Sequence, residues 1–510
     1  MTNSSSARFG LGGLLAAALL LLLTPGAGAK TINVPDDRAT IQGAVNVADP
    51  GDRILVEARK RRYFESVVVT TNRLEIAGVP KRGELPVVDG TARGGSTDEL
   101  VFDIDADDVT VRRLDLRNGT GSECTGMRCE FSGLELRMSD QGGDCIEIDG
   151  GQGRVERSRF IGCDDNAIEI RGVLGKVRDN YMRQIDNDCV LIDGDKAVVE
   201  GNRVHNCEDS EGIQVDGNGA DVRRNLVRSS DGNAFEISGN FNLVKDNNAL
   251  NIEDDCFDVD GIKSRVTDNG AKACDGGWEV SGENMRVIGN RGSLLGDDAG
   301  FDVDCSDRAG GAAEANVCKQ AVIAENRASD NNNDDEGFEI DDFVGEGGLV
   351  IRDNVAADNN DGGFELDVDR SRISGNVSIR DGAEGNEPGL EIDGVRNVVV
   401  GNRAVSSGEH GLEVSGNKTQ VRRNVSRRAN VDGINIEFGE DLVARLNEAF
   451  SNNGDGIEND ATDTKLIDNV SAGNRRDCAN DGTIAVERGN RCRDGSNFNG
   501  PGTLDRPARR

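Results

Sequence analysis

The stretch Asn233-Ala-Phe-Glu-Ile-Ser-Gly239 returns 22 residues later as Asp255-Cys-Phe-Asp-Val-Asp-Gly261, and related seven-residue segments recur from Asp144 to Asp455. Apolar and polar residues alternate within each segment, as in a β-strand with one buried face. Most steps between segments are 21 to 23 residues. A repeat of this length, built from short strands and turns, predicts a solenoid in which residues about one repeat apart become neighbours.

Two further features keep the phase of this repeat. An Asn occurs at one turn position of each unit, where its amide is expected to hydrogen-bond to the amide of the next coil. An aromatic residue occupies one inward position in six successive units, which predicts a stack of rings in the core. The Asn positions are Asn180, Asn202, Asn225, Asn247, Asn269, Asn290, Asn326, Asn354, Asn376, Asn402, Asn424, Asn447 and Asn469, and the aromatic positions are Phe235, Phe257, Trp278, Phe301, Phe338 and Phe364.

The regions outside the repeat are short. Residues 1–29 are typical of an export signal, because Arg8 precedes an apolar run from Leu14 to Leu23 that is too short for a comfortable membrane span. Residues 30–490 are predicted to form one elongated domain, with an amphipathic helix at about 37–48 that closes its open end and an insertion at about 305–335. Residues 491–510 are predicted to be a loose tail. We therefore expect a secreted, periplasmic or cell-surface protein with no membrane span after the signal is removed.

The twelve cysteines fit an oxidising location. Three pairs are spaced 18 residues apart, in phase with the repeat, and three more are close in sequence. Local disulfides are therefore the preferred interpretation over a metal site. The expected pairs are Cys145 with Cys163, Cys189 with Cys207, Cys256 with Cys274, Cys305 with Cys318, Cys478 with Cys492, and Cys124 with Cys129.

The chain carries 93 acidic and 59 basic residues, a formal net charge of −34. This charge argues against nucleic acid as a partner, because phosphate binding needs Lys and Arg. It also disfavours a polyanionic glycan, unless a bound metal inverts the local sign. A simpler explanation remains open, in which the acidity keeps an exported protein soluble.

The polar positions of the repeat predict two outward lines of carboxylates, while Arg and Lys are expected mainly on another face. Ca²⁺ binds six to eight oxygens from flexible acidic groups. The densest patch therefore predicts a Ca²⁺ site, with a solvated acidic face as the alternative. The first line is Glu147, Glu169, Glu236, Asp258, Glu279, Asp302, Glu339, Glu365, Glu391, Glu413 and Glu458, the second is Asp149, Asp193, Asp216, Asp260, Asp304, Asp341, Asp367 and Asp393, and the expected Ca²⁺ ligands are Asp258, Asp260, Asp298, Asp302, Asp304, Asp335, Glu339 and Asp341.

The start of the mature chain resembles a known family. Thr31-Ile-Asn-Val-Pro, Thr40-Ile-Gln-Gly-Ala-Val, Asp49-Pro-Gly-Asp-Arg-Ile-Leu-Val and Leu74-Glu-Ile-Ala-Gly are similar to the opening of pectin-lyase-like β-helix proteins. With the repeats, the resemblance covers about residues 30–490. It implies an all-β fold, a single-stranded right-handed parallel β-helix, and carbohydrate binding or cleavage in many members but not all.

No complete catalytic motif is present in the sequence. Gly143-Asp-Cys and Asp254-Asp-Cys resemble a segment of polygalacturonases, and His410-Gly resembles another. However, no His follows Asp255 by one coil and the RxK segment is missing. His205 and His410 are predicted to be surface turn residues too far apart to share a site. We therefore assign no catalytic residue, and whether the protein is an enzyme stays open.

Three functions remain. The sequence favours an exported β-helix protein that binds or processes extracellular glycan and holds Ca²⁺ on its acidic face. The first alternative is a non-catalytic structural or surface protein with a cationic partner. The second is a glycoside hydrolase that uses paired carboxylates. The oligomeric state cannot be inferred from these patterns.

Overall fold

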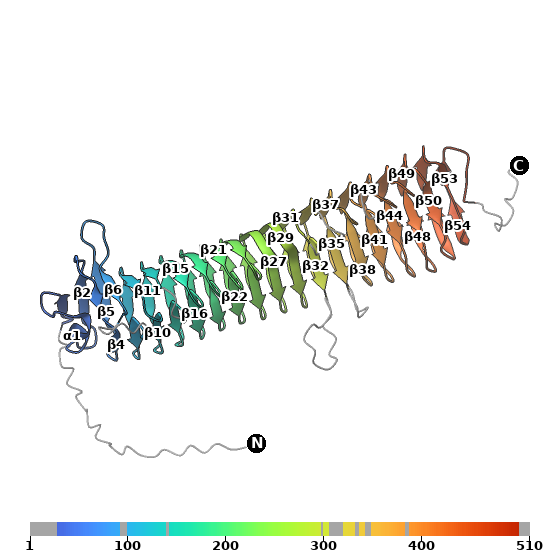
Figure 1. The fold of residues 1–510 in the computed structure, drawn as a ribbon. Coiled ribbons are helices and arrows are strands. Elements are labelled where there is room, and N and C mark those ends of the chain that lie inside the picture. Colours follow the sequence, from blue (N-terminus) through green and yellow to red (C-terminus); the bar gives the residue numbers. More distant parts are fainter. Residues whose placement is uncertain are drawn as a thin grey trace, which may run out of the picture.

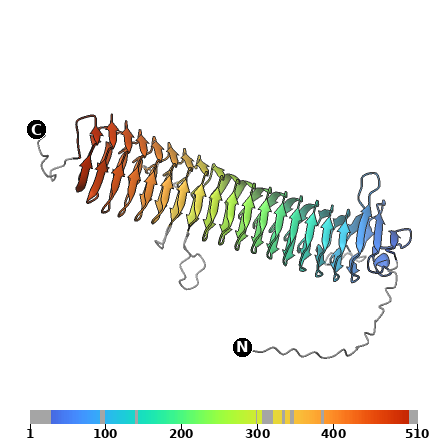
Figure 2. The same cartoon turned by 180° about the vertical axis from the view of Figure 1, so that it is seen from behind.

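The computed structural model of the protein describes residues 28–91, 99–138, 142–296, 299–304, 320–331, 336–341, 348–382 and 387–498. The coils stack into a long rod, with α1 (Ile41–Val45) at one end and β54 (Ile484–Arg488) at the other (Figures 1 and 2). The rod is a right-handed parallel β-solenoid of about 19 turns with about 22 residues per coil. The predicted fold class is therefore confirmed.

Each coil contributes one strand to each of three rows. The first row contains the repeated segment described above, and its middle side chain points outward. Its strands are β4 (Val67–Val69), β7 (Phe102–Ile104), β10 (Ser122–Cys124), β13 (Ile146–Ile148), β16 (Ile168–Arg171), β19 (Leu191–Asp193), β22 (Ile213–Asp216), β25 (Phe235–Ser238), β27 (Asn248–Asp260), β29 (Gly270–Ser281), β32 (Phe301–Asp304), β35 (Phe338–Asp341), β38 (Phe364–Asp367), β41 (Leu390–Asp393), β44 (Leu412–Val414), β47 (Ile434–Ile436), β50 (Asp455–Asn459) and β53 (Arg476–Cys478).

The second row forms a sheet of 20 strands. It begins with the first strand of the described residues and ends with the last coil. Its strands are β1 (Thr31–Val34), β2 (Arg53–Glu57), β5 (Glu75–Val79), β8 (Thr110–Arg112), β11 (Glu130–Ser132), β14 (Arg154–Glu156), β17 (Lys176–Arg178), β20 (Val198–Glu200), β23 (Asp221–Arg223), β26 (Leu243–Lys245), β28 (Arg265–Thr267), β30 (Arg286–Ile288), β33 (Val322–Ala324), β36 (Val350–Arg352), β39 (Arg372–Ser374), β42 (Val398–Val400), β45 (Gln420–Arg422), β48 (Val443–Arg445), β51 (Thr464–Ile467) and β54.

The third row follows the Asn turn of each coil. Because β27 and β29 each continue from the third row into the first, these two rows join into one sheet of 35 strands. The other strands of the third row are β3 (Tyr63–Phe64), β6 (Val87–Asp89), β9 (Asp115–Arg117), β12 (Glu135–Arg137), β15 (Arg159–Cys163), β18 (Tyr181–Ile185), β21 (Arg203–Cys207), β24 (Leu226–Ser230), β31 (Arg291–Ser293), β34 (Arg327–Ser329), β37 (Val355–Ala357), β40 (Val377–Ile379), β43 (Arg403–Val405), β46 (Val425–Arg427), β49 (Glu448–Phe450), β52 (Val470–Ala472) and β55 (Arg491–Cys492).

The aromatic side chains form the predicted stack in the core. Neighbouring ring centroids from Phe235 to Phe364 lie 4.2 to 5.5 Å apart and their planes differ by 3° to 6°. Trp278 and the five Phe residues are buried. The sequence prediction that residues one repeat apart are vertical neighbours is therefore confirmed.

The Asn residues form a second internal column, which we call the asparagine ladder. At Asn247, the backbone N–H and Nδ2 both donate to Oδ1 of Asn269, at 2.9 and 3.2 Å, and Nδ2 also donates to the carbonyl oxygen of Val222 at 2.8 Å. The same contacts run from Asn180 to Asn469, and the ladder ends at Asn490. The Asn247 amide thus donates to both neighbouring coils and accepts from the preceding one, where Asn225 donates to its Oδ1.

Five of the expected cysteine pairs are joined in the structure. These are Cys124–Cys129, Cys145–Cys163, Cys189–Cys207, Cys256–Cys274 and Cys478–Cys492. Cys305 and Cys318 lie outside the described residues.

The ends of the rod differ in detail from the predicted boundaries. Helix α1 spans five residues inside the predicted 37–48, with Thr40 as its N-cap, and contacts β1, β2 and β4. At the other end the solenoid extends past residue 490, because β55 pairs with β52 and Phe498 is buried. The predicted insertion at 305–335 contains the regular strands β33 and β34, whereas 305–319 and 332–335 lie outside the described residues.

No helix among the described residues is long and apolar enough to cross a bilayer. The predicted export signal lies almost entirely outside them, since the description begins at residue 28. The final residues of the predicted tail, 499–510, lie outside them as well.

Candidate functional site on the acidic face

The middle residues of the first-row strands form one column, which we call the acidic row. The side chains on either side of each one are buried, as Phe257 and Val259 are around Asp258, so the middle carboxylate points out. Strand register places these residues directly above one another, interrupted only by Leu191, Gln214 and Asn435. The acidic row is Glu147, Glu169, Glu236, Asp258, Glu279, Asp302, Glu339, Glu365, Glu391, Glu413 and Glu458.

The second predicted line runs beside the acidic row, two residues further along each strand. Asp193 is in register with Asp216, and Asp341 is in register with Asp367, which is in register with Asp393. Arg171, Ser238 and Ser281 interrupt this line. It is therefore less continuous than the acidic row.

The sequence predicts that Arg and Lys lie mainly on another face, but two arginines bind carboxylates of the acidic face itself. Arg171 lies in the second line and binds three carboxylates: Asp149 at 3.0 Å, Glu169 at 2.5 Å, and Glu147. Arg476, at the C-terminal end of the acidic face, binds Asp455 and lies 3.6 Å from Glu458. These two arginines lie near the two ends of the acidic row.

One tight cluster of carboxylates lies near the start of the acidic row. One oxygen from each of Asp144, Glu147 and Glu169 lies within 4.8 Å of the others. Burial, and then the hydrogen bond to Glu169, raise the pKa of Asp144 to about 9. Asp144 therefore holds a proton at neutral pH, in hydrogen-bond contact with Glu169.

A second cluster lies near the other end. Asp432, Asp455 and Glu458 again offer oxygens within 4.8 Å of one another, and Glu458 also groups with Asp460 and Asp481. Burial, and then the hydrogen bond to Asp432, raise the pKa of Glu458 to about 8. Both clusters could hold a cation in place of the proton.

The prediction that both histidines are surface turn residues is wrong. Only 12% of the His410 side chain is exposed; its Nδ1 lies 3.4 Å from Asp432 and its Nε2 lies 3.4 Å from Glu413. His410 lies two residues before β44, the same position that Asp144 and Asp432 occupy before β13 and β47. A side chain at this position faces the equivalent side chain of the next coil. His205 is in strand β21, not in a turn.

The predicted Ca²⁺ ligands are only partly described. In the acidic row Asp302 and Glu339 are direct strand neighbours, whereas Glu279 separates Asp258 from Asp302. Burial, and then the neighbouring Asp260, raise the pKa of Asp258 to about 8. Asp298, Asp335 and the side chain of Asp304 lie outside the described residues, so the eight-residue site stays a prediction, while Asp260 and Asp341 lie on the second line.

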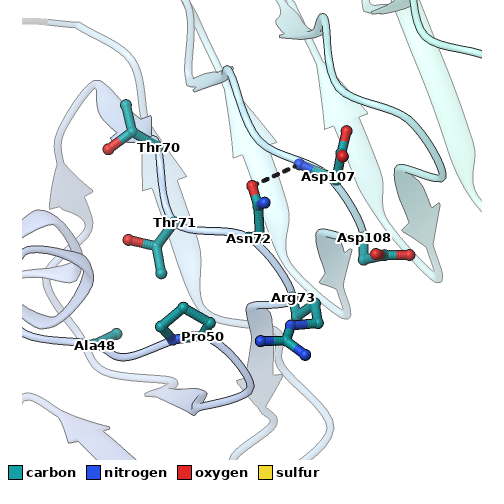
Figure 3. Close-up of a pocket in the computed structure, with 8 residues that line it drawn as sticks. All are labelled: Ala48, Pro50, Thr70, Thr71, Asn72, Arg73, Asp107 and Asp108. Carbon is teal, nitrogen blue, oxygen red and sulfur yellow. Dashed lines mark hydrogen bonds between the residues drawn. The ribbon is translucent and has the colours of Figure 1, made fainter. Parts of the chain in front are cut away.

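A polar hollow of about 460 Å³ lies at the N-terminal end, away from the acidic row (Figure 3). In it, Asn72 Oδ1 accepts a 3.0 Å hydrogen bond from the backbone N–H of Asp107. None of the predicted site residues lines it. Its lining residues are Ala48, Pro50, Thr70, Thr71, Asn72, Arg73, Asp107 and Asp108.

Sequence reasoning missed Asp144, Arg171, Asp432 and Asp455 as members of the site. Asp144, Asp432 and Asp455 begin their repeated segments, three residues before the acidic row, so the repeat phase itself contained the necessary information. Only the polar positions in the middle and at the end of each repeated segment were considered. A third line of acidic residues, at the first position of the segment, was therefore missed.

Comparison with known proteins supports the architecture. A family model described as a right-handed β-helix region matches residues 117–271. No curated protein sequence matches the chain.

Several solved β-helix structures are similar at low identity. A PL6 family alginate lyase shares 10% identity over 91% of this chain and 99% of its own, with a TM-score of 0.36. A PL6 family polysaccharide lyase from Pseudopedobacter saltans shares 11% over 77% and 85%, with a TM-score of 0.39. A DFA-IIIase from Arthrobacter chlorophenolicus shares 15% over 74% and 95%, with a TM-score of 0.33. Such identities transfer no activity, and the chain is established by its own structure as a right-handed parallel β-helix protein.

Proposed function

We propose that this is an exported protein that binds extended extracellular glycan along its acidic face, with Ca²⁺ held between the carboxylates. The five disulfides support export, because such bonds persist mainly outside the reducing cytosol. The observation that carries the proposal is the acidic row itself, whose seven carboxylates from Glu236 to Glu391 follow one another in strand register without interruption.

Ionised carboxylates only accept hydrogen bonds, so their partner must supply donors or positive charge. Glycan hydroxyls supply donors at regular intervals along a linear chain. Ca²⁺ supplies charge and coordinates both carboxylate and hydroxyl oxygens. Neighbouring carboxylates such as Asp302 and Glu339 lie one strand spacing apart, about 4.8 Å, which lets one ion contact both.

A thermal melt tests the cation directly. Added Ca²⁺ is expected to raise the melting temperature and EDTA to reverse the shift, because a ligand that binds only the folded state stabilises it. The double variant Asp302→Asn, Glu339→Gln should lose most of this shift and its Ca²⁺-dependent binding on a glycan array. Glu448→Gln, an exposed third-row carboxylate between Val425 and Val470, is the matched control. An unchanged melt with Ca²⁺ would leave only a solvated acidic face.

A second function, glycoside hydrolysis, is favoured by Asp144 and Glu169. A protonated carboxyl beside an ionised one is the arrangement that supplies a general acid and a nucleophile or base. The two carboxyls are hydrogen-bonded to each other, closer than the spacing of about 5–5.5 Å in retaining enzymes or 6.5–9.5 Å in inverting ones, so their distance assigns neither stereochemical course. Release of reducing sugar that is lost above about pH 9 and abolished in Asp144→Asn would support it. No release from any glycan that binds would exclude it.

A further inference from the structure

The third row has a surface with the opposite charge to the acidic face. Strands β15, β18, β21 and β24 are consecutive, and their outward side chains form two lines in register. Four exposed arginines and two aromatic rings occupy most of the positions. We call this surface the arginine face; one line is Arg159, Tyr181, Arg203 and Leu226, and the other is Ile161, Arg183, His205 and Arg228.

These four arginines take no part in the ion pairs of the described residues. None of the four pairs with a carboxylate of the described residues, whereas Arg154, Arg178 and Arg223 on the second row do. The inward residues Phe160, Met182, Val204 and Val227 are buried, and Cys163 and Cys207 at the strand ends are joined to other cysteines. The guanidinium groups therefore stand on a rigid base, which reduces the entropy lost when a ligand binds.

The two rings lie side by side between the charges. The centroids of Tyr181 and His205 are 5.6 Å apart, and the guanidinium of Arg159 lies 5.3 Å from the Tyr181 ring. Burial, and then Arg228, Arg183 and Arg203, lower the pKa of His205, so the imidazole is neutral at pH 7. Charged and uncharged positions thus alternate along each line.

We propose that the arginine face binds an acidic glycan in which carboxylated and uncharged sugars alternate. On each line, like positions are two coils apart, roughly 9.6 Å at the spacing of parallel strands. The two lines together place one arginine on each coil, but within one line the arginines are two coils apart. A sugar of an extended chain is about as long as one strand spacing, so for a chain lying along one line this distance matches an acid on every second sugar. Guanidinium groups bind carboxylates through paired hydrogen bonds, and the Tyr181 ring offers an apolar surface to the intervening sugar.

This inference rests on the proposed glycan binding but assigns it to a second surface that needs no metal. The two are therefore separable with EDTA, which should remove binding at the acidic face and leave binding at the arginine face. An acidic glycan would bind only at the arginine face, because the acidic row and the net charge of −34 repel it elsewhere on the protein.

Calorimetric titration of the full chain in EDTA tests the proposal with three octasaccharides. Hyaluronan, with uronate on every second sugar, is expected to bind. Polygalacturonate, with an acid on every sugar, should bind at least about tenfold more weakly, and neutral malto-octaose should not bind. Equal or tighter binding of polygalacturonate would overturn the alternation, and no binding of hyaluronan would overturn the site.

Paired variants locate the surface. Arg183→Gln with Arg203→Gln should weaken hyaluronan binding at least about tenfold. The control is Arg265→Gln with Arg286→Gln, two exposed second-row arginines that are also register neighbours, and it removes the same charge. Equal losses in both pairs would mean that only net charge matters and would overturn the assignment. Retained hyaluronan binding in Asp302→Asn, Glu339→Gln separates this result from failure of the acidic-face proposal.

Discussion

The asparagine ladder and the acidic row are both columns of one kind of side chain, stacked at the spacing of parallel strands. An amide is both a hydrogen-bond donor and an acceptor, so each Asn side chain can hydrogen-bond to the next one. The column is therefore buried without leaving these polar groups unpaired. An ionised carboxylate only accepts, so stacking makes each one repel its neighbours. The same geometry therefore stabilises one column and leaves the other dependent on protons, Arg171, Arg476 or a bound cation.

The difference teaches where function can lie in a solenoid. Repetition multiplies the chemistry of whichever residue is repeated. A repeated residue that can hydrogen-bond to its own kind, such as Asn, stabilises the fold. A repeated residue that repels its own kind, such as Asp or Glu, needs a proton, a basic side chain or a ligand beside it. Burial, and then neighbouring carboxyl groups, raise the pKa of Asp144, Asp258 and Glu458, in keeping with the second case.

The largest expected effect comes from breaking the ladder in its middle. Asn269→Ala removes the oxygen that accepts from the backbone N–H and Nδ2 of Asn247, and the amide that donates to the Val244 carbonyl oxygen. Buried groups left without partners cost about 1–3 kcal/mol each, so we expect a loss of about 3–5 kcal/mol. Denaturation, with hydrogen exchange of β26 and β28 as a local measure, should show it. Exposed Asn248→Ala should cost little, and equal losses would refute the role of the ladder.

The next effect is the pH dependence of stability. Asp144, Asp258 and Glu458 have folded pKa values of about 9, 8 and 8, above the ordinary value near 4. Between these values the folded state holds more protons than the unfolded state, so the free energy of unfolding falls as pH rises. We expect a loss of about 2 kcal/mol from pH 5 to pH 9 after solvent screening. Denaturation at several pH values measures it, saturating Ca²⁺ should reduce it, and stability that rises with pH over this window would contradict it.

The repeat allowed much of this structure to be predicted. Register along the acidic row and the stack of Phe257, Trp278 and Phe301 follow from spacing alone, because every coil repeats the same constraint. Arg171 and His410 could not be placed in the same way, since each occurs once and its partners depend on side-chain direction. The arginine face was missed because its charges alternate between two lines, so no single repeat position is basic throughout.

The smallest expected effect sharpens the comparison most. Glu365 is exposed, stands between Glu339 and Glu391, and Gln keeps its shape while removing its charge. Two like charges at strand spacing repel by about 0.9 kcal/mol even in water, so after screening Glu365→Gln should stabilise by about 0.5–1 kcal/mol. The pKa of Glu391, raised to about 7 by burial, Asp393 and Glu365, should fall in an NMR titration. The third-row control Glu448→Gln, whose register neighbours are Val425 and Val470, should change neither quantity. If Glu365→Gln instead lowered the free energy of unfolding, as Asn269→Ala is expected to do, the carboxylates would be holding the coils together. The acidic row would then need no external cation.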